Sequence, residues 1–241
     1  MHTVCTYRPF VCIAPSTACL EEARNVELSR TDVTNGLLGG YESFARLIGG
    51  LTPEGWRTRT RCTGWEARDV AGHVVGQLDD VLAGTVGGRT PDEQAEQLRY
   101  QDPATLADRL RGAAAGFGEL LGALDDGAWA GPSGVPDVTI DQGVRALWFD
   151  TYVHADDIHA ALGLPSDRGE ALRASVVHLR DLLLRGGWGP ARLALDGMPE
   201  LDVGDGGPVL RGDPLRFLLV GTGRADPAEF GLDESVNIYR P

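Results

Sequence analysis

The sequence predicts an α-helical bundle followed by a small α+β domain, and three observations lead to this fold class. Four long segments carry apolar side chains at three- and four-residue spacing, which is typical of amphipathic helices. After residue 165 the pattern changes to short apolar runs bounded by Gly and Pro, which favours strands. The chain has 241 residues, of which 42% are hydrophobic and 24% charged, enough to bury one large core or two smaller ones.

The long helices are predicted over residues 31–50, 63–86, 103–124 and 139–163, and Gly or Pro residues follow each of them. Helices of similar length with connections of unequal length are typical of a four-helix bundle, so we expect one over residues 31–165.

Two of these helices have expected N-terminal caps. Thr63 is followed three residues later by Glu66, and Thr139 is followed three residues later by Gln142. This spacing is typical of a capping box, in which the two side chains bond to each other's backbone N–H groups. We therefore expect Thr63 and Thr139 to begin the second and fourth helices.

The C-terminal part is expected to form a helix at 168–185, strands at 192–195 and 208–211, a helix at 213–220 and a last strand at 236–239. The predicted domains are a bundle at 29–165 and a small α+β domain at 166–241. Residues 1–28 contain prolines and lack helical periodicity, so we expect a poorly ordered N-terminal extension.

Composition excludes several classes of function. The chain has 22 basic and 35 acidic residues and a formal net charge of −13, so no broad positive field attracts nucleic acid or anionic lipid. All the basic residues are arginine, which excludes a Schiff-base lysine and a P-loop lysine. No apolar run reaches the roughly 18 residues that a membrane span needs.

The four cysteines, Cys5, Cys12, Cys19 and Cys62, match neither the close pairs of a structural zinc site nor a disulfide framework. We interpret all four as reduced thiols, and we expect the protein to be cytoplasmic.

Asp150 and His154 are the first candidates for chemistry. They lie four residues apart on the inward edge of the fourth predicted helix, and His73 lies beside the apolar stripe of the second. A bundle can bring such edges together, so the three side chains are a candidate open site for a divalent metal. An ion pair beside a buried core histidine is the alternative that the spacing leaves open.

Three segments carry recognisable motifs: CTGWEARDVAGH at 62–73, DTYVHADDI at 150–158 and PLRFLLVGTGR at 214–224. Together they resemble the DinB-like, mycothiol-dependent maleylpyruvate isomerase family, in which a metal-binding four-helix bundle precedes a sterol-carrier-like second domain. The resemblance covers about residues 30–241, with the motifs in the family's order.

The resemblance implies that His73, Asp150 and His154 are metal ligands and that Arg224 is a catalytic residue that binds a carboxylate. Asp157 matches a carboxylate of the family and either accepts a hydrogen bond from a ligand or closes a polar network. The family usually has Glu where this chain has Asp150. An aspartate is shorter by one methylene, and the difference of roughly 1 Å either lengthens a metal contact or requires a closer helix.

The resemblance also implies a divalent metal, usually zinc, and the low-molecular-weight thiol mycothiol. In the family's isomerisation the thiolate adds to the cis double bond of a diacid, the resulting single bond rotates, and elimination gives the trans isomer. The expected partners are therefore this thiol and a small-molecule substrate. Two alternatives stay open: a mycothiol S-transferase, and a non-catalytic small-molecule-binding protein with a weakened metal site.

Overall fold

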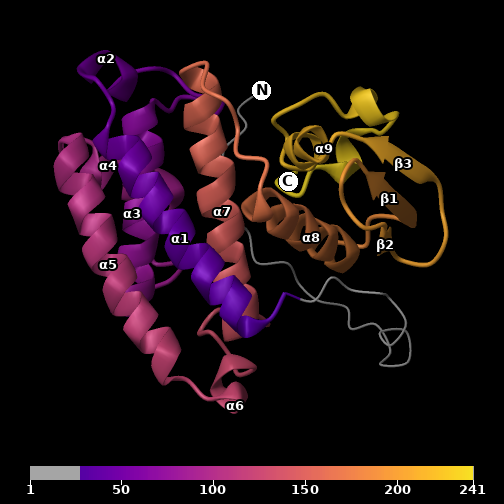
Figure 1. Ribbon diagram of the computed structural model, residues 1–241, viewed down its shortest axis with the longest axis horizontal. Helices are drawn as coiled ribbons and strands as arrows, with labels where there is room; N and C mark the ends of the chain where they lie inside the picture. Colours follow the sequence, from indigo (N-terminus) through magenta and orange to yellow (C-terminus); the bar gives the residue numbers. More distant parts are fainter. Residues whose placement is uncertain (1–27, 241) are drawn as a thin grey trace. The chain divides into compact units, whose positions relative to one another are not determined.

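The computed structural model describes residues 28–240, which form two compact units at 29–167 and 168–240 (Figure 1). The predicted extension at 1–28 lies, except for its last residue, outside the described residues. Among the helices of residues 28–240, none is long and apolar enough to cross a membrane.

The first unit is a helical bundle. Its helices are α1 (Arg30–Gly49), α2 (Pro53–Trp56), α3 (Ala67–Ala83), α4 (Pro91–Leu98), α5 (Pro103–Ala123), α6 (Asp126–Trp129) and α7 (Ile140–Ala161). The long helix α1 packs against α5 and α7, and α3 packs against α4, α5 and α7. All four predicted long helices are therefore confirmed, and the shorter α2, α4 and α6 are additional.

The two expected helix starts have different outcomes. At α7 the capping box of Thr139 and Gln142 is confirmed. At α3 the expected cap at Thr63 is wrong, because residues 62–65 form a turn that the bond from Trp65 N to Cys62 O closes. The helix begins after Glu66, which forms a capping box with Asp69 instead.

Helix α4 lies between the second and third predicted long helices, where the sequence analysis predicts no helix. Thr90 caps it and exchanges hydrogen bonds with Glu93 in a capping box. Its inner face consists of Gln94, Ala95 and Leu98, all of which are buried. The helix packs along α3 and brings a buried amide, that of Gln94, beside the residues of the candidate site.

The second unit combines a sheet with two helices. The strands β1 (Ala191–Leu195), β2 (Leu201–Val203) and β3 (Val209–Gly212) form a sheet in the order β2-β1-β3, with β1 antiparallel to β2 and parallel to β3. Helix α8 (Glu170–Arg185) packs against α9 (Pro214–Gly221) and β2. The predicted α+β architecture is thus confirmed.

The strand expected at 236–239 is wrong. Glu234–Val236 forms a 3₁₀ turn, because the Asp233 carboxylate accepts a hydrogen bond from Ser235 N at 2.8 Å. Asn237 then accepts from Tyr239 N through its side chain. These side-chain hydrogen bonds favour a turn over an extended strand.

Candidate metal centre

Two helices of the bundle bring three metal-ligating side chains together. His73 lies on α3, and Asp150 and His154 lie one turn apart on α7. The Nε2 atom of His73 is 3.3 Å from Asp150 Oδ2, and the Nε2 atom of His154 is 3.6 Å from Asp150 Oδ1. One potential ligand atom from each residue lies within 4.8 Å of the other two. The packing of α3 against α7 therefore creates the cluster that the sequence analysis expected.

The two imidazoles of the cluster are almost completely shielded from solvent, whereas the Asp150 side chain is 18% exposed. His73 is 4% exposed and His154 is 0% exposed, and their ring centroids lie 5.0 Å apart in an edge-to-face arrangement. The Trp65 ring covers both imidazoles, with centroid distances of 5.4 Å to His73 and 6.1 Å to His154. The packing of this apolar ring lowers the local dielectric around the cluster.

The side chain of His73 is oriented by an amide that contacts its Nδ1 atom, the ring nitrogen that faces away from Asp150. Its Nδ1 atom is 2.8 Å from Oε1 of Gln94, and the amide nitrogen of Gln94 donates to Asp80 Oδ2 at 2.7 Å. Because a carboxylate only accepts, the Gln94 nitrogen must face Asp80 and its oxygen must face His73. His73 Nδ1 therefore carries the proton, and in the neutral ring Nε2 presents its lone pair to the cluster.

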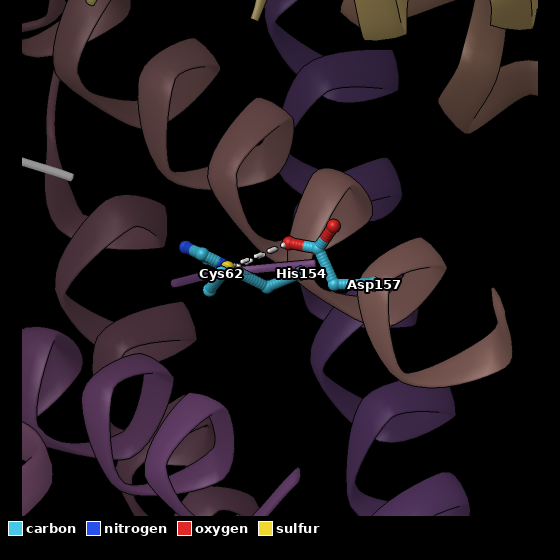
Figure 2. A group of neighbouring side chains, drawn as sticks. All are labelled: Cys62, His154 and Asp157. Atoms are coloured by element: carbon cyan, nitrogen blue, oxygen red, sulfur yellow. Dashed lines mark hydrogen bonds and ion pairs between the residues drawn. The ribbon is translucent and has the colours of Figure 1, made fainter. Parts of the chain in front are cut away.

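His154 is oriented by a carboxylate (Figure 2). Its Nδ1 atom donates to Asp157 Oδ2 at 3.1 Å, and the same oxygen accepts from Cys62 Sγ at 3.1 Å. Asp157 Oδ1 accepts from Arg61 Nε at 3.2 Å. Asp157, which is 0% exposed, thus receives three donors, from His154, Cys62 and Arg61, and this geometry agrees with both of the roles that the resemblance left open.

Cys62, His154 and Asp157 are themselves close enough to hold an ion. The thiol and the imidazole already donate to Asp157, and the Arg61 guanidinium pairs with both Asp157 and Asp156. A cation there would have to displace both the thiol proton and the imidazole proton.

The other face of the cluster fits a divalent metal. With both Nδ1 atoms bonded to acceptors, the two Nε2 atoms and one carboxylate converge, and His154 Nε2 has no hydrogen-bond partner among residues 28–240. A buried convergence of acceptors is unfavourable unless a cation occupies it. The Asp150 carboxylate approaches the two imidazoles through different oxygens, Oδ2 toward His73 at 3.3 Å and Oδ1 toward His154 at 3.6 Å. The shorter carboxylate therefore reaches both imidazoles.

Tyr41 on α1 adds a neutral phenol near this site. Burial and, secondarily, the charge of Asp150 raise the pKa of Tyr41 well above its usual range. The phenol therefore stays protonated at any physiological pH and adds no second negative charge beside Asp150.

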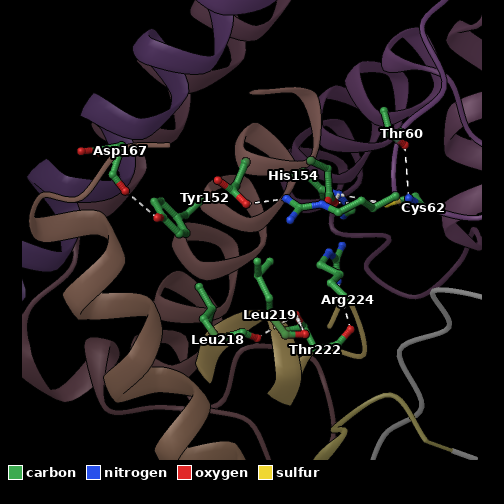
Figure 3. A network of polar contacts seen from close by, with 12 residues as sticks. Thr60, Cys62, Tyr152, His154, Asp167, Leu218, Leu219, Thr222 and Arg224 are labelled. Carbon is green, nitrogen blue, oxygen red and sulfur yellow. Dashed lines mark hydrogen bonds and ion pairs between the residues drawn. The ribbon is translucent and has the colours of Figure 1, made fainter. Parts of the chain in front are cut away.

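Arg224 belongs to the second unit and follows α9. Its Nη1 atom donates to Thr222 O at 3.3 Å, and its backbone N–H donates to Leu219 O at 2.7 Å (Figure 3). These contacts fix the turn that carries the guanidinium. The catalytic role of Arg224 stays a prediction.

Sequence reasoning missed Gln94 and gave no role to Cys62. Cys62 opens the first motif, and its position beside Asp157 results from the turn at 62–65. Gln94 lies outside all three motifs, and no sequence signal marks it, since it is one polar residue in a short polar helix.

The fold and the cluster define the class: a helical bundle with a candidate metal centre, followed by a small α+β unit. A family model described as the mycothiol maleylpyruvate isomerase N-terminal domain matches residues 38–159, just over half of the chain. The chain therefore belongs to the DinB-like, mycothiol-dependent maleylpyruvate isomerase family.

Solved structures share the fold. The crystal structure of the mycothiol-dependent maleylpyruvate isomerase matches with a TM-score of 0.61 and 14% identity, over 82% of this chain and 90% of that chain. The structure of a histidine-to-alanine mutant of the mycothiol-dependent maleylpyruvate isomerase matches with a TM-score of 0.60 and 13% identity, over 86% and 96%. A comparison with curated protein sequences found no match.

Proposed function

We propose that this chain is a metal- and mycothiol-dependent enzyme that isomerises a small, acidic, cis-unsaturated electrophile. The observation that carries the proposal is the convergence of two imidazole Nε2 atoms and the Asp150 carboxylate in a buried site. Family membership supports the thiol. A bound divalent metal, most simply zinc, supplies Lewis acidity that lowers the pKa of a coordinated thiol.

The chain's own residues have distinct tasks in this proposal. His73, Asp150 and His154 hold the metal, and Asp157 keeps the proton of His154 on Nδ1. Trp65 excludes water from the imidazole side of the site. Arg224 binds a substrate carboxylate, because a guanidinium offers two parallel donors that match the two oxygens.

The first experiment measures metal content. After reconstitution with zinc and desalting, elemental analysis of the full chain should give about one metal per chain. His154→Ala should lose the metal, whereas His159→Ala, on the same helix but outside the cluster, should retain it. Equal metal content in both variants would overturn the ligand assignment.

The second experiment measures turnover of a panel of cis-unsaturated diacids with mycothiol present or absent, followed by absorbance. Isomerisation that requires both mycothiol and metal supports the proposal. A product that retains the thiol by mass spectrometry would instead identify an S-transferase. Metal-free protein that binds ligand without any turnover would identify a binding protein.

A further inference from the structure

Gln94 occupies the space between His73 and Asp80 on the side of α3 that faces α4. It is 5% exposed, and its amide makes one bond to each neighbour, at 2.8 Å to His73 Nδ1 and 2.7 Å to Asp80 Oδ2. No other side chain among residues 28–240 has a recorded bond to His73 Nδ1. On its Nδ1 side this imidazole is therefore held by one neutral amide, while its Nε2 side faces Asp150.

Asp80 in turn pairs with a guanidinium. It is 5% exposed, and the Arg89 guanidinium donates to its Oδ1 from Nε at 2.9 Å and from Nη2 at 2.6 Å. Arg89 Nη2 also donates to Gly76 O at 3.0 Å, which anchors the guanidinium to α3. Because the Asp80 carboxylate accepts hydrogen bonds from Arg89, it presents an acceptor to Gln94, and the amide nitrogen rather than the amide oxygen faces it.

We infer that Gln94 is a positioning residue, which the Arg89–Asp80 pair orients so that it holds His73 as the tautomer with its proton on Nδ1. Nε2 is then the ring nitrogen that faces Asp150 and His154. The inference deepens the proposed function and rests on it only for the consequence for metal affinity, since the tautomer is a property of the metal-free chain.

The Nδ1 atoms of the two imidazoles therefore have different kinds of hydrogen-bond acceptor. Asp157 carries a charge and accepts from His154, whereas Gln94 is neutral and accepts from His73. An anionic acceptor raises the basicity of its imidazole more than an amide does. Gln94 thus fixes the direction of the His73 lone pair without adding a further charge to a site that already contains Asp150.

The direct test is the tautomer of His73 in metal-free protein. Long-range ¹H–¹⁵N NMR of histidine-labelled full chain, at mildly alkaline pH where imidazoles are neutral, should show a protonated Nδ1 and a bare Nε2 for His73. The Gln94→Met variant keeps the size and removes the acceptor, so the fixed preference should be lost. A wild-type His73 protonated on Nε2, or an unchanged tautomer in Gln94→Met, would overturn the inference.

A conservative variant distinguishes the hydrogen-bonding role of residue 94 from its contribution to packing. Gln94→Glu keeps an acceptor for His73, and combining it with Asp80→Asn restores a donor that faces the new carboxylate. The double variant should recover the Nδ1–H tautomer that Gln94→Met loses, and failure to recover it would contradict the inference even if the variant folds.

Zinc affinity measures the consequence that the orientation of His73 should have for metal binding. By competition with a chromophoric chelator, Gln94→Met should bind zinc about 10- to 100-fold more weakly than wild type. Gln101→Met, at an exposed glutamine, should not differ from wild type. If wild type binds no zinc while its His73 tautomer responds to Gln94→Met, the proposed metal function fails and the positioning role stands. Zinc affinity unchanged in Gln94→Met would contradict the linked consequence.

Discussion

Gly76 lies so close to Gln94 that a methyl group on its Cα would be 2.9 Å from Gln94 Cβ and 3.3 Å from Cγ. One turn earlier, a methyl group at Gly72 would be 3.0 Å from Ala95 O. Two glycines on one face of α3 thus let α4 approach closely. This close approach brings the Gln94 amide within hydrogen-bonding distance of His73.

We expect Gly76→Ala to push α4 away from α3, because Gln94 Cβ is fixed to the backbone of α4 and cannot swing aside. Overpacking of this kind costs about 1–3 kcal/mol of unfolding free energy. Urea unfolding of the metal-free protein measures the loss. The same variant should weaken the hold of Gln94 on His73 and lower zinc affinity.

The matched control is Gly112→Ala on the exposed face of α5, where an added methyl group meets nothing within 4 Å. Alanine is favoured over glycine in a helix interior, so this variant should be stabilised by about 0.5–1 kcal/mol. If Gly76→Ala also proved stabilising, the close approach of α3 and α4 would not require glycine.

Much of the bundle was readable from the sequence, because helix periodicity and capping boxes are local signals. Thr139 and Gln142 behaved as expected. At Thr63 the expected cap does not form, because residues 62–65 adopt a turn and Glu66 and Asp69 form the capping box instead. Helix α4 was missed because only Ala95 and Leu98 mark its apolar side.

In the candidate site, too, one part follows from local sequence and the other depends on how the helices pack. Asp150 and His154 are four residues apart on one helix, so their proximity follows from helix geometry. That His73 meets them depends on how α3 packs against α7. Whether an aspartate is long enough depends on the same packing, which places Asp150 Oδ2 3.3 Å from His73 Nε2, and its role as a metal ligand stays a prediction.

The Asp150→Asn variant tests the contribution of the negative charge to metal binding, because the two side chains have nearly the same shape. The amide keeps one oxygen acceptor but loses the charge that offsets a divalent ion, so zinc affinity should fall by about 100-fold, on the order of 3 kcal/mol. Chelator competition measures it. Asp141→Asn, at the start of the same helix and outside the cluster, is the control. Undiminished affinity in Asp150→Asn would remove this residue from the ligand set.

Cys62 should stabilise the fold through its hydrogen bond to Asp157 rather than through thiol reactivity. Cys62→Ala removes a donor to a buried carboxylate and should cost about 1–3 kcal/mol of unfolding free energy. Cys62→Ser retains a donor of similar size and should recover most of the loss. Turnover with mycothiol should persist in Cys62→Ser. A complete loss of turnover in that folded, metal-loaded variant would show that the protein's own thiol takes part in the reaction.

Arg224→Lys tests the proposed carboxylate-binding role. Lysine keeps the positive charge but lacks the planar pair of donors, so the KM for an acidic substrate should rise about 10-fold, while zinc content stays at the wild-type level. Steady-state kinetics with mycothiol in excess measure this change. Arg211→Lys, an exposed position on β3 of the same unit, should leave KM unchanged. A neutral ester of the same substrate should be turned over equally by wild type and Arg224→Lys, because it offers no carboxylate to bind. If Arg224→Lys impaired the diacid and the ester to the same extent, the arginine would act on the fold or on the thiol and not on the substrate carboxylate.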